Sequence, residues 1–241
     1  MNSKDLSVRT GCKDIWNAHM VEGVTFCKHD IPYCPTTATS IPKDILTWEE
    51  AKSIHKKHIS KKDYDYTIDS FVCFYMDDYK FDGTRGVWNN PEQALQILKH
   101  FAGAITVDFS TYIDFPEPIK TYATYRMRLL GYWWGKNGIE VINNVRWGTF
   151  ETYDYCFEGI PTESIVAIGT VGGSPRRLVD RDRFVSGLTE MIKRLRPHTI
   201  LIYGSASYDC FDQLKAQGIK IIHYPSKTAR DFERRRANEQ R

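Results

Sequence analysis

Short runs of β-branched and aromatic residues alternate with helical stretches from Phe71 onward. Six of these runs are predicted to be strands: FVCFYMDD (71–78), AITVDFS (104–110), IEVINNVRW (139–147), SIVAIGTVG (164–172), TILIYGS (199–205) and IKIIHYP (219–225). Strands that alternate with helices are typical of a parallel sheet built from successive strand–helix units. The pattern therefore predicts an α/β fold, either a partial (β/α) barrel or an open doubly wound sheet, and periodicity does not separate the two.

One predicted helix, at 121–138, is unusually aromatic. It contains Tyr125, Tyr132, Trp133 and Trp134 and ends at an Asn-Gly pair. Such rings can stack on nucleic-acid bases, but aromatic residues at helical spacing more often face a core. We therefore expect these rings to pack inside the protein.

Composition divides the chain into three regions. Residues 1–70, with the stretch IPYCPTTATSIPKD and a short predicted helix LTWEEAKSIHKKHISKK, are predicted to be an N-terminal wrapping extension. Residues 71–225 are predicted to form the α/β domain, and residues 226–241 a basic C-terminal tail. The tail carries the whole net charge of +3. We interpret it as a solvated terminal helix, with a phosphate-seeking arm as the alternative.

The overall composition is that of a globular protein. The chain is 41% hydrophobic, 13% aromatic and 26% charged, which excludes disordered, collagen-like and low-complexity classes. No apolar run reaches the ~18 residues that a membrane-spanning helix needs, and the first residues lack the apolar stretch of a signal peptide. We therefore expect a cytoplasmic protein with no membrane partner, and the sequence leaves the oligomeric state open.

The cysteine pattern gives no sign of disulfides or of a bound metal. Six cysteines are scattered along the chain, and we expect all of them to be reduced. Cys27, His29 and Cys34 cluster, but no fourth ligand completes the set that zinc usually requires. The sequence predicts no structural metal and identifies no cofactor.

Polar residues follow the predicted strands, at the edge where parallel α/β sheets bind ligands. Asp108 follows a buried run, so burial is expected to raise its pKa, and it could act as a base or nucleophile. Asp78, at the end of the neighbouring strand, could supply the second carboxylate of an acid–base pair. The alternative is structural: Asp108 caps the following loop or binds Arg126.

The loop TVGGSPRRL combines free backbone N–H groups with guanidinium groups, which suits a phosphate or carboxylate. It fits neither the Walker motif nor the dinucleotide fingerprint, and the alternative is a flexible surface loop. The predicted substrate- or anion-binding residues are Arg126, Asn143, Asn144, Arg146, Trp147, Gly172, Gly173, Ser174, Arg176, Arg177, Gly204 and Ser205. We predict that Asp108, Arg126, Asn144, Arg146 and the loop 172–177 line one pocket.

Several segments together carry a resemblance to a known family. They are DIPYCPTT, HFAGAITVDFSTYIDFPEPIK, YRMRLLGYWWGKNG, EVINNVRWGT, YDYCFEGIP, SIVAIGTVGGSPR and HTILIYGSA. Over nearly the whole chain the sequence resembles the domain-of-unknown-function 4417 family, which phages, plasmids and bacterial chromosomes carry. The resemblance implies a phage or mobile-element context and assigns no catalytic role. A more distant analogy, of fold only, is with tRNA transglycosylases that exchange bases in a barrel with a catalytic aspartate.

Two functions from different classes are compatible with these residues. The first is an enzyme that acts on a nucleotide or nucleic acid, by hydrolysis or exchange at a glycosidic or phosphate centre, with Asp108 as the acidic residue. The second is a non-catalytic phage or plasmid protein that binds nucleic acid or a host protein through its basic tail and loop. The second function is favoured if the affinity for nucleic acid falls steeply with salt and Asp108→Asn leaves that affinity unchanged.

Overall fold

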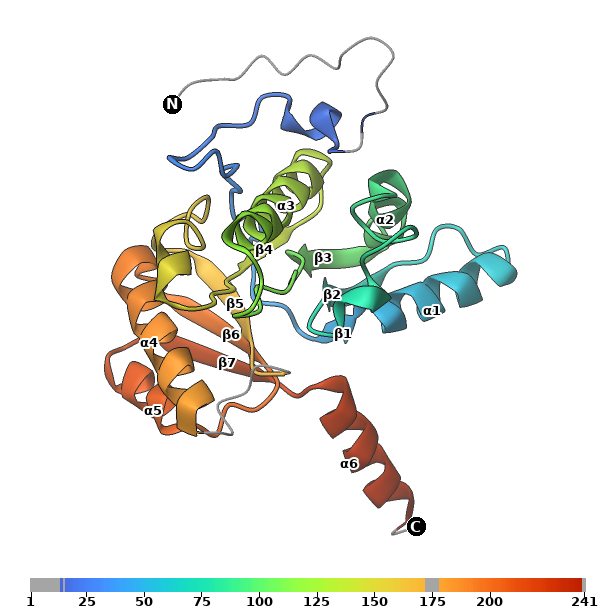
Figure 1. The fold of residues 1–241 in the computed structure, drawn as a ribbon. Helices are drawn as coiled ribbons and strands as arrows, with labels where there is room; N and C mark the ends of the chain where they lie inside the picture. The colour runs from blue at the N-terminus through green and yellow to red at the C-terminus, as the bar shows by residue number, and fades with distance from the viewer. Residues whose placement is uncertain (1–13, 15, 172–177, 240–241) are drawn as a thin grey trace.

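The computed structural model describes Asp14, residues 16–171 and residues 178–239. In this part of the chain seven strands form one parallel sheet, and their spatial order from β1 to β7 is their order in the sequence. The strands are β1 (Ile45–Thr47), β2 (Ile68–Cys73), β3 (Phe101–Ile105), β4 (Val141–Asn144), β5 (Ile165–Gly169), β6 (Thr199–Tyr203) and β7 (Lys220–Tyr224). The sheet is curled into a half-barrel (Figure 1). Because the strand order never reverses direction along the sheet, the doubly wound alternative is excluded.

Helices cover the convex face of this sheet. They are α1 (Trp48–Ser60), α2 (Pro91–Leu98), α3 (Glu117–Lys136), α4 (Leu178–Leu195) and α5 (Asp209–Ala216), while α6 (Lys227–Glu239) extends away from the body (Figure 1). Short 3-10 helices lie at η1 (Ala18–Val21), η2 (Asp78–Lys80) and η3 (Phe150–Asp154). None of the helices in the described ranges is long and apolar enough to cross a membrane.

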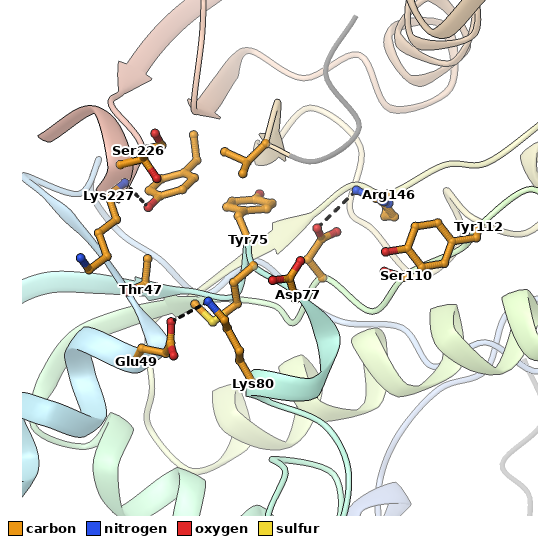
Figure 2. A pocket seen from close by; sticks show the side chains of 15 residues that line it. Thr47, Glu49, Tyr75, Asp77, Lys80, Ser110, Tyr112, Arg146, Ser226 and Lys227 are labelled. Carbon is orange, nitrogen blue, oxygen red and sulfur yellow. Dashed lines mark hydrogen bonds and ion pairs between the residues drawn. The ribbon is translucent and has the colours of Figure 1, made fainter. Parts of the chain in front are cut away.

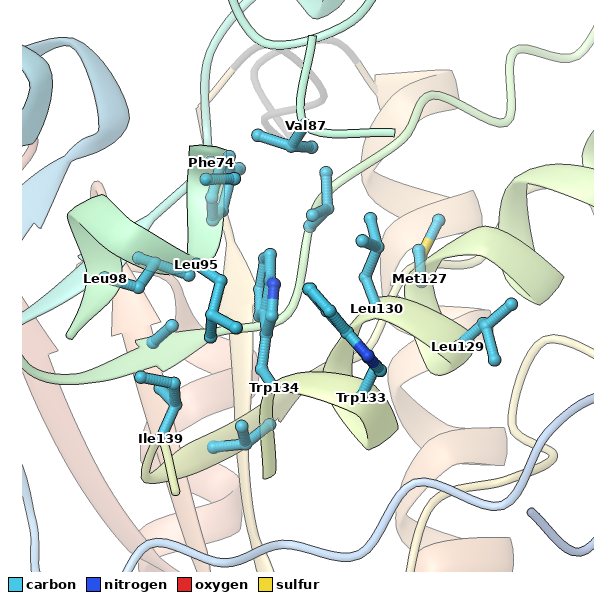
Figure 3. Close-up of a cluster of buried hydrophobic side chains, with 14 of the residues drawn as sticks. Phe74, Val87, Leu95, Leu98, Met127, Leu129, Leu130, Trp133, Trp134 and Ile139 are labelled. Carbon is cyan, nitrogen blue, oxygen red and sulfur yellow. The ribbon is translucent and has the colours of Figure 1, made fainter. Parts of the chain in front are cut away.

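Side chains alternate between the two faces of the strands, as the pleat requires. The concave face carries one apolar cluster to which every strand or the residues just after it contribute, including Ile45, Tyr75, Ile105, Ile142, Ala167, Leu201 and Tyr224. Two larger clusters lie on the convex face, one beneath α1 to α3 and one beneath α4 and α5. In the first, Trp134 is buried and stacks on Phe74 at 5.7 Å between ring centroids (Figure 3). The expectation that Trp133 and Trp134 face a core is therefore confirmed.

Side chains hold the two edges of the sheet near each other. Among the described residues no ladder joins β7 to β1. Instead, the Tyr224 hydroxyl donates to the carbonyl of Pro42, just before β1. From α6, Arg230 donates to Glu50 Oε2 at 2.8 Å and lies 3.8 Å from Asp44 Oδ1. The N-terminal part of the chain and the C-terminal helix therefore meet across the opening of the half-barrel.

The parallel α/β class is confirmed, with three local differences from the sequence prediction. Strand β1 lies in the region assigned to the extension, because three residues are too short to show a periodic pattern. Helix α4 begins at Leu178, within the stretch expected to be a polar loop. Most of the predicted strands also continue past the observed ladders, because residues such as Phe74, Val107 and Val145 extend the apolar runs into the loops that build the site.

Candidate functional site

A cavity of about 270 Å³ opens at the carboxyl ends of the strands. Its lining comes from the segments that follow β1 to β6 and from the start of α6, so residues far apart in the sequence meet there (Figure 2). This is the edge where parallel α/β sheets bind ligands, because the loops converge there.

Asp108 forms the buried part of this cavity. Its side chain is 10% exposed, and its two oxygens face different partners. Asn144 Nδ2 donates to Oδ1 at 2.8 Å, and Arg146 Nη1 lies 3.4 Å from Oδ2. Burial raises the pKa of Asp108, Arg146 and Asn144 act against this rise, and the charge of Asp78 adds to it. The site therefore contains a carboxyl group that gains a proton more readily than an ordinary aspartate.

Four polar groups of Asn144, two in the main chain and two in the side chain, are hydrogen-bonded. Its main-chain N–H donates to Thr106 Oγ1 at 2.8 Å, and its main-chain carbonyl accepts from Arg128 Nη1 at 3.0 Å. The Tyr75 hydroxyl donates to Asn144 Oδ1 at 3.0 Å. Because Oδ1 is bound by this donor, the amide nitrogen points at Asp108. Tyr75 thus sets the direction of the hydrogen bond that Asp108 receives.

Tyr75 is itself held by stacking. Its ring lies 5.4 Å from that of Tyr203 with 20° between the planes, and a Cβ at Gly169 would lie 2.4 Å from Tyr75 Cδ1. Burial and the nearby charge of Asp108 raise the pKa of Tyr75 well above its usual value, so its hydroxyl keeps its proton. The Tyr203 hydroxyl accepts the main-chain N–H of Lys227 at 2.9 Å. Helix α6 therefore begins on the same aromatic pair that orients Asn144.

Charged side chains of both signs line the rest of the cavity. Lys80 Nζ lies 3.1 Å from Glu49 Oε2, and Asp77 is exposed at the mouth (Figure 2). The hydrogen bond to Asp108 is the only one that Arg146 makes within the described part of the chain. A guanidinium carries five N–H donors, so Arg146 has donors left for a ligand.

The structure brings together three of the predicted site residues, Asp108, Asn144 and Arg146. Asn143 lies on the opposite face of β4, where its amide donates to the carbonyl of Cys34 at 2.9 Å. A strand alternates its side chains, so only one of two adjacent asparagines can face Asp108, and Asn144 does so from a buried position behind the cavity lining. Trp147 lies next to Arg146 and lines a second cavity, described below.

Asp78 is close to the site without lining the cavity. Its carboxylate accepts the main-chain N–H of Ser110 at 3.0 Å and the Ser110 hydroxyl at 2.7 Å. It therefore holds the loop after β3 in place, and the carboxylates that line the cavity besides Asp108 are Asp77 and Glu49.

The placement of Arg126 differs from the prediction. Arg126 Nη1 pairs with Asp82 Oδ2 at 2.8 Å, and its guanidinium lies 3.8 Å from the centroid of the Phe109 ring. It does not line the cavity, and Asp108 does not bind it. Asp82 belongs to the loop after β2, and a sequence pattern does not show which loop carboxylate an arginine on a later helix will meet.

The remaining predicted residues fall into two groups. Gly204 adopts a φ of +117°, and its N–H donates to the carbonyl of Tyr224 at 2.9 Å, while the Ser205 hydroxyl bonds that of Ser207. These two residues shape the turn after β6 and do not line the cavity. Residues Gly172, Gly173, Ser174, Arg176 and Arg177 lie outside the described residues.

Sequence reasoning missed several residues of the cavity. Tyr75 and Tyr203 have the signature of ordinary core residues of strands, and Lys227 was assigned to the tail. Asp77 lies near the end of the first predicted strand and Lys80 just after it, so a position at a strand end was the available signal for both.

All six cysteines are expected to be reduced, and the structure describes five of them. Cys27, Cys34, Cys73, Cys156 and Cys210 are free, and Cys12 lies outside the described residues. Near the predicted cluster, Nδ1 of His29 lies 2.8 Å from Glu158 Oε1. Within the described ranges no group of three or more His, Cys, Asp or Glu side chains has a geometry that could hold a metal ion.

The fold and the cavity define a class of protein. A curled parallel sheet with helices on its convex face and a polar cavity at the carboxyl ends of its strands is a (β/α) half-barrel. Within this class, the chain belongs to the family Domain of unknown function (DUF4417), which matches residues 26–225. No solved structure matches the chain significantly.

Two curated relatives come from phages. The Gene 1 protein of Mycobacterium phage L5 is 38% identical over 143 residues, which are 59% of this chain and 61% of that protein. The Gene 1 protein of Mycobacterium phage D29 is 31% identical over 202 residues, 84% of this chain and 70% of that protein. The match thus covers less than two thirds of the phage L5 protein, and the family resemblance expected from the sequence is confirmed.

Proposed function

We propose that the protein is an enzyme that hydrolyses or exchanges a nucleotide or nucleic-acid substrate, with Asp108 as its acid–base group. The observation that carries the proposal is the position of Asp108. It is a buried carboxyl group with a raised pKa that still lines a cavity at the carboxyl edge of a parallel half-barrel. Carboxyl groups with raised pKa values suit general acid catalysis near neutral pH.

The reaction that fits this group best is cleavage at a glycosidic centre. Protonated Asp108 donates its proton to the departing base as the bond from the sugar carbon to the base nitrogen breaks. A water molecule adds its hydroxyl to the sugar carbon and gives its other proton to Asp77, which lines the cavity together with Glu49, the partner of Lys80. In exchange, an incoming base takes the place of water.

Arg146 supports an anionic substrate. Its guanidinium lies at the wall of the cavity, and the N–H donors that bind no other described residue match the oxygen geometry of a phosphate. Its charge also stabilises Asp108 once the proton has left, because the two groups are 3.4 Å apart. Arg146 therefore has two roles: it binds the phosphate of the substrate, and its charge stabilises the deprotonated form of Asp108. The phage relatives support a role in a phage or another mobile element.

The test is to incubate the purified protein with nucleosides, nucleotides and single-stranded DNA and RNA, and to separate the products by chromatography. We expect release of a free base, at a rate that Asp108→Asn lowers by about a hundredfold or more. Asp212→Asn on α5 is the matched control, since this carboxylate is 74% exposed and pairs only with Lys215 within the described residues.

Two results would contradict the proposal in different ways. If phosphate is released and no base, the reacting centre is a phosphate, and the glycosidic mechanism is wrong. If Asp108→Asn folds and turns over substrate as fast as Asp212→Asn, then Asp108 is not the acid–base group.

A non-catalytic binding function is favoured by one observation, the helix α6. Arg234, Arg235 and Arg236 are exposed on a helix that extends away from the body (Figure 1). Such an arm suits nucleic-acid phosphates or an acidic host protein. Three results together would support this function. The affinity for nucleic acid should fall steeply with salt, replacement of all three arginines by Ala should abolish binding, and Asp108→Asn should leave binding intact.

A further inference from the structure

A second cavity, of about 370 Å³, adjoins the first at the carboxyl edge of the sheet. Arg146 and Tyr112 line both cavities, so these two side chains form the boundary between them. The apolar part of its wall comes from Ile113, Trp147 and Phe184, and the charged part from Arg183, Asp114 and Asp180. A cavity with an aromatic and aliphatic wall thus opens beside the polar one.

From this arrangement we infer that the site takes a single-stranded nucleic acid, with the reacting nucleotide at Asp108 and the neighbouring base in the second cavity. The inference rests on the proposed function and specifies its substrate class. Arg146 lies between the two cavities, and among the described residues its guanidinium donates only to Asp108, so it is placed to hold the phosphate that links the two nucleotides.

The walls of the second cavity suit a flat base. The Tyr112 side chain is 53% exposed at the boundary and touches Phe115 only edge to edge, at 5.1 Å between ring centroids. The Trp147 ring is fixed from behind, because Phe184 lies 5.4 Å away and a Cβ on Gly187 would lie 2.2 Å from it. Fixed aromatic side chains bind bases of any sequence by stacking.

Three exposed apolar side chains lie in the loops near the two cavities, and one of them, Ile113, also lines the second cavity. Tyr79, Ile113 and Phe150 are 77%, 51% and 73% exposed, and they lie in the segments after β2, β3 and β4. Segments that follow parallel strands emerge at one edge of a sheet, so these side chains lie at the same edge of the sheet as the site. Their number there suits a strand of several nucleotides better than one free nucleotide.

The experiment compares the affinities for thymidine monophosphate and a short oligothymidylate by titration calorimetry. Uridine monophosphate and oligouridylate form a second arm, and a duplex of equal length a third. We expect the single strands to bind at least about tenfold more tightly than the mononucleotides and the duplex. The DNA and RNA arms show which single strand is preferred.

Substitutions in the wall of the second cavity test whether the neighbouring base binds there. Tyr112→Ala should lower the preference for the oligonucleotide by about tenfold, and Arg183→Ala should also lower it. The matched control is Tyr64→Ala, because Tyr64 is 59% exposed in the loop before β2, at the opposite edge of the sheet. It should leave the preference unchanged.

Equal affinity for mononucleotide and oligonucleotide would overturn the inference, as would a Tyr112→Ala variant with the full preference. The proposed function is tested separately. If a mononucleotide loses its base in an Asp108-dependent reaction but oligonucleotides bind no better, only the extended substrate is wrong. If no substrate of either length reacts, the proposed function itself is wrong.

Discussion

Replacement of Arg128 by Met should destabilise the protein strongly, because this arginine holds together three segments behind the site. Arg128 is fully buried on α3, and its three guanidinium nitrogens donate to three main-chain carbonyls. Nε donates to Glu158 at 3.0 Å, Nη1 to Asn144 at 3.0 Å and Nη2 to Cys156 at 3.1 Å. Within the described residues no carboxylate pairs with it, and burial lowers its pKa to about 10.

The expected loss follows from two opposing effects. Methionine fills a similar volume but donates no hydrogen bond, so three buried carbonyls lose their partner at ~1–3 kcal/mol each. Against this, the variant no longer buries a charge without a counter-ion, which returns several kcal/mol. The lost hydrogen bonds should dominate, since they connect the end of β4 to the loop after η3. We expect a net loss of about 3 kcal/mol in the free energy of unfolding.

Urea unfolding measures this loss directly. In a chain of this size, about 3 kcal/mol corresponds to a fall of ~6–12 °C in melting temperature. Arg235→Met is the matched control, because Arg235 is exposed on α6, and it should change stability by less than ~0.5 kcal/mol. An Arg128→Met protein as stable as this control would refute the argument that the three carbonyls need a buried donor.

Three further predictions concern the site. Tyr75→Phe removes the donor to Asn144 Oδ1 and should cost ~1–2 kcal/mol in urea unfolding and shift the acid limb of the pH–rate profile; an unchanged profile would mean that Tyr75 does not orient the amide. Gly169→Ala places a Cβ 2.4 Å from the Tyr75 ring and should cost ~1–3 kcal/mol, so a neutral result would show that the ring moves freely. Asp108 has a raised pKa in the folded state, so ionisation of this group lowers stability as pH rises through that pKa. Asp108→Asn should therefore melt higher than the unsubstituted protein at neutral pH, and the difference should disappear below the ordinary pKa of 3.8; a variant that melts lower at neutral pH would contradict this sign.

The fold was more predictable from the sequence than the site. Buried strands such as TILIYGS carry continuous apolar runs, and their alternation with helices is a local property of the chain. Contacts between distant segments are not local, which is why the pairing of Arg126 with Asp82 was missed. Lys227 illustrates the same limit, because a basic tail gives no sign that its first turn lies against Tyr203. Asp108 was predictable because a carboxylate directly after a buried strand is unusual in itself.

The open seam of the half-barrel bears on aggregation. A sheet that does not close leaves a row of unpaired backbone groups on each outer strand, and such rows are templates for pairing with other chains. Strand β1 offers a row of only three residues, β7 begins with the exposed Lys220, and α6 is anchored beside β1 through Arg230. Short edges, charged residues and covering elements are the means by which proteins prevent edge-to-edge association. A chain that ends before α6 should therefore self-associate at concentrations where the full chain stays dispersed, as light scattering would show.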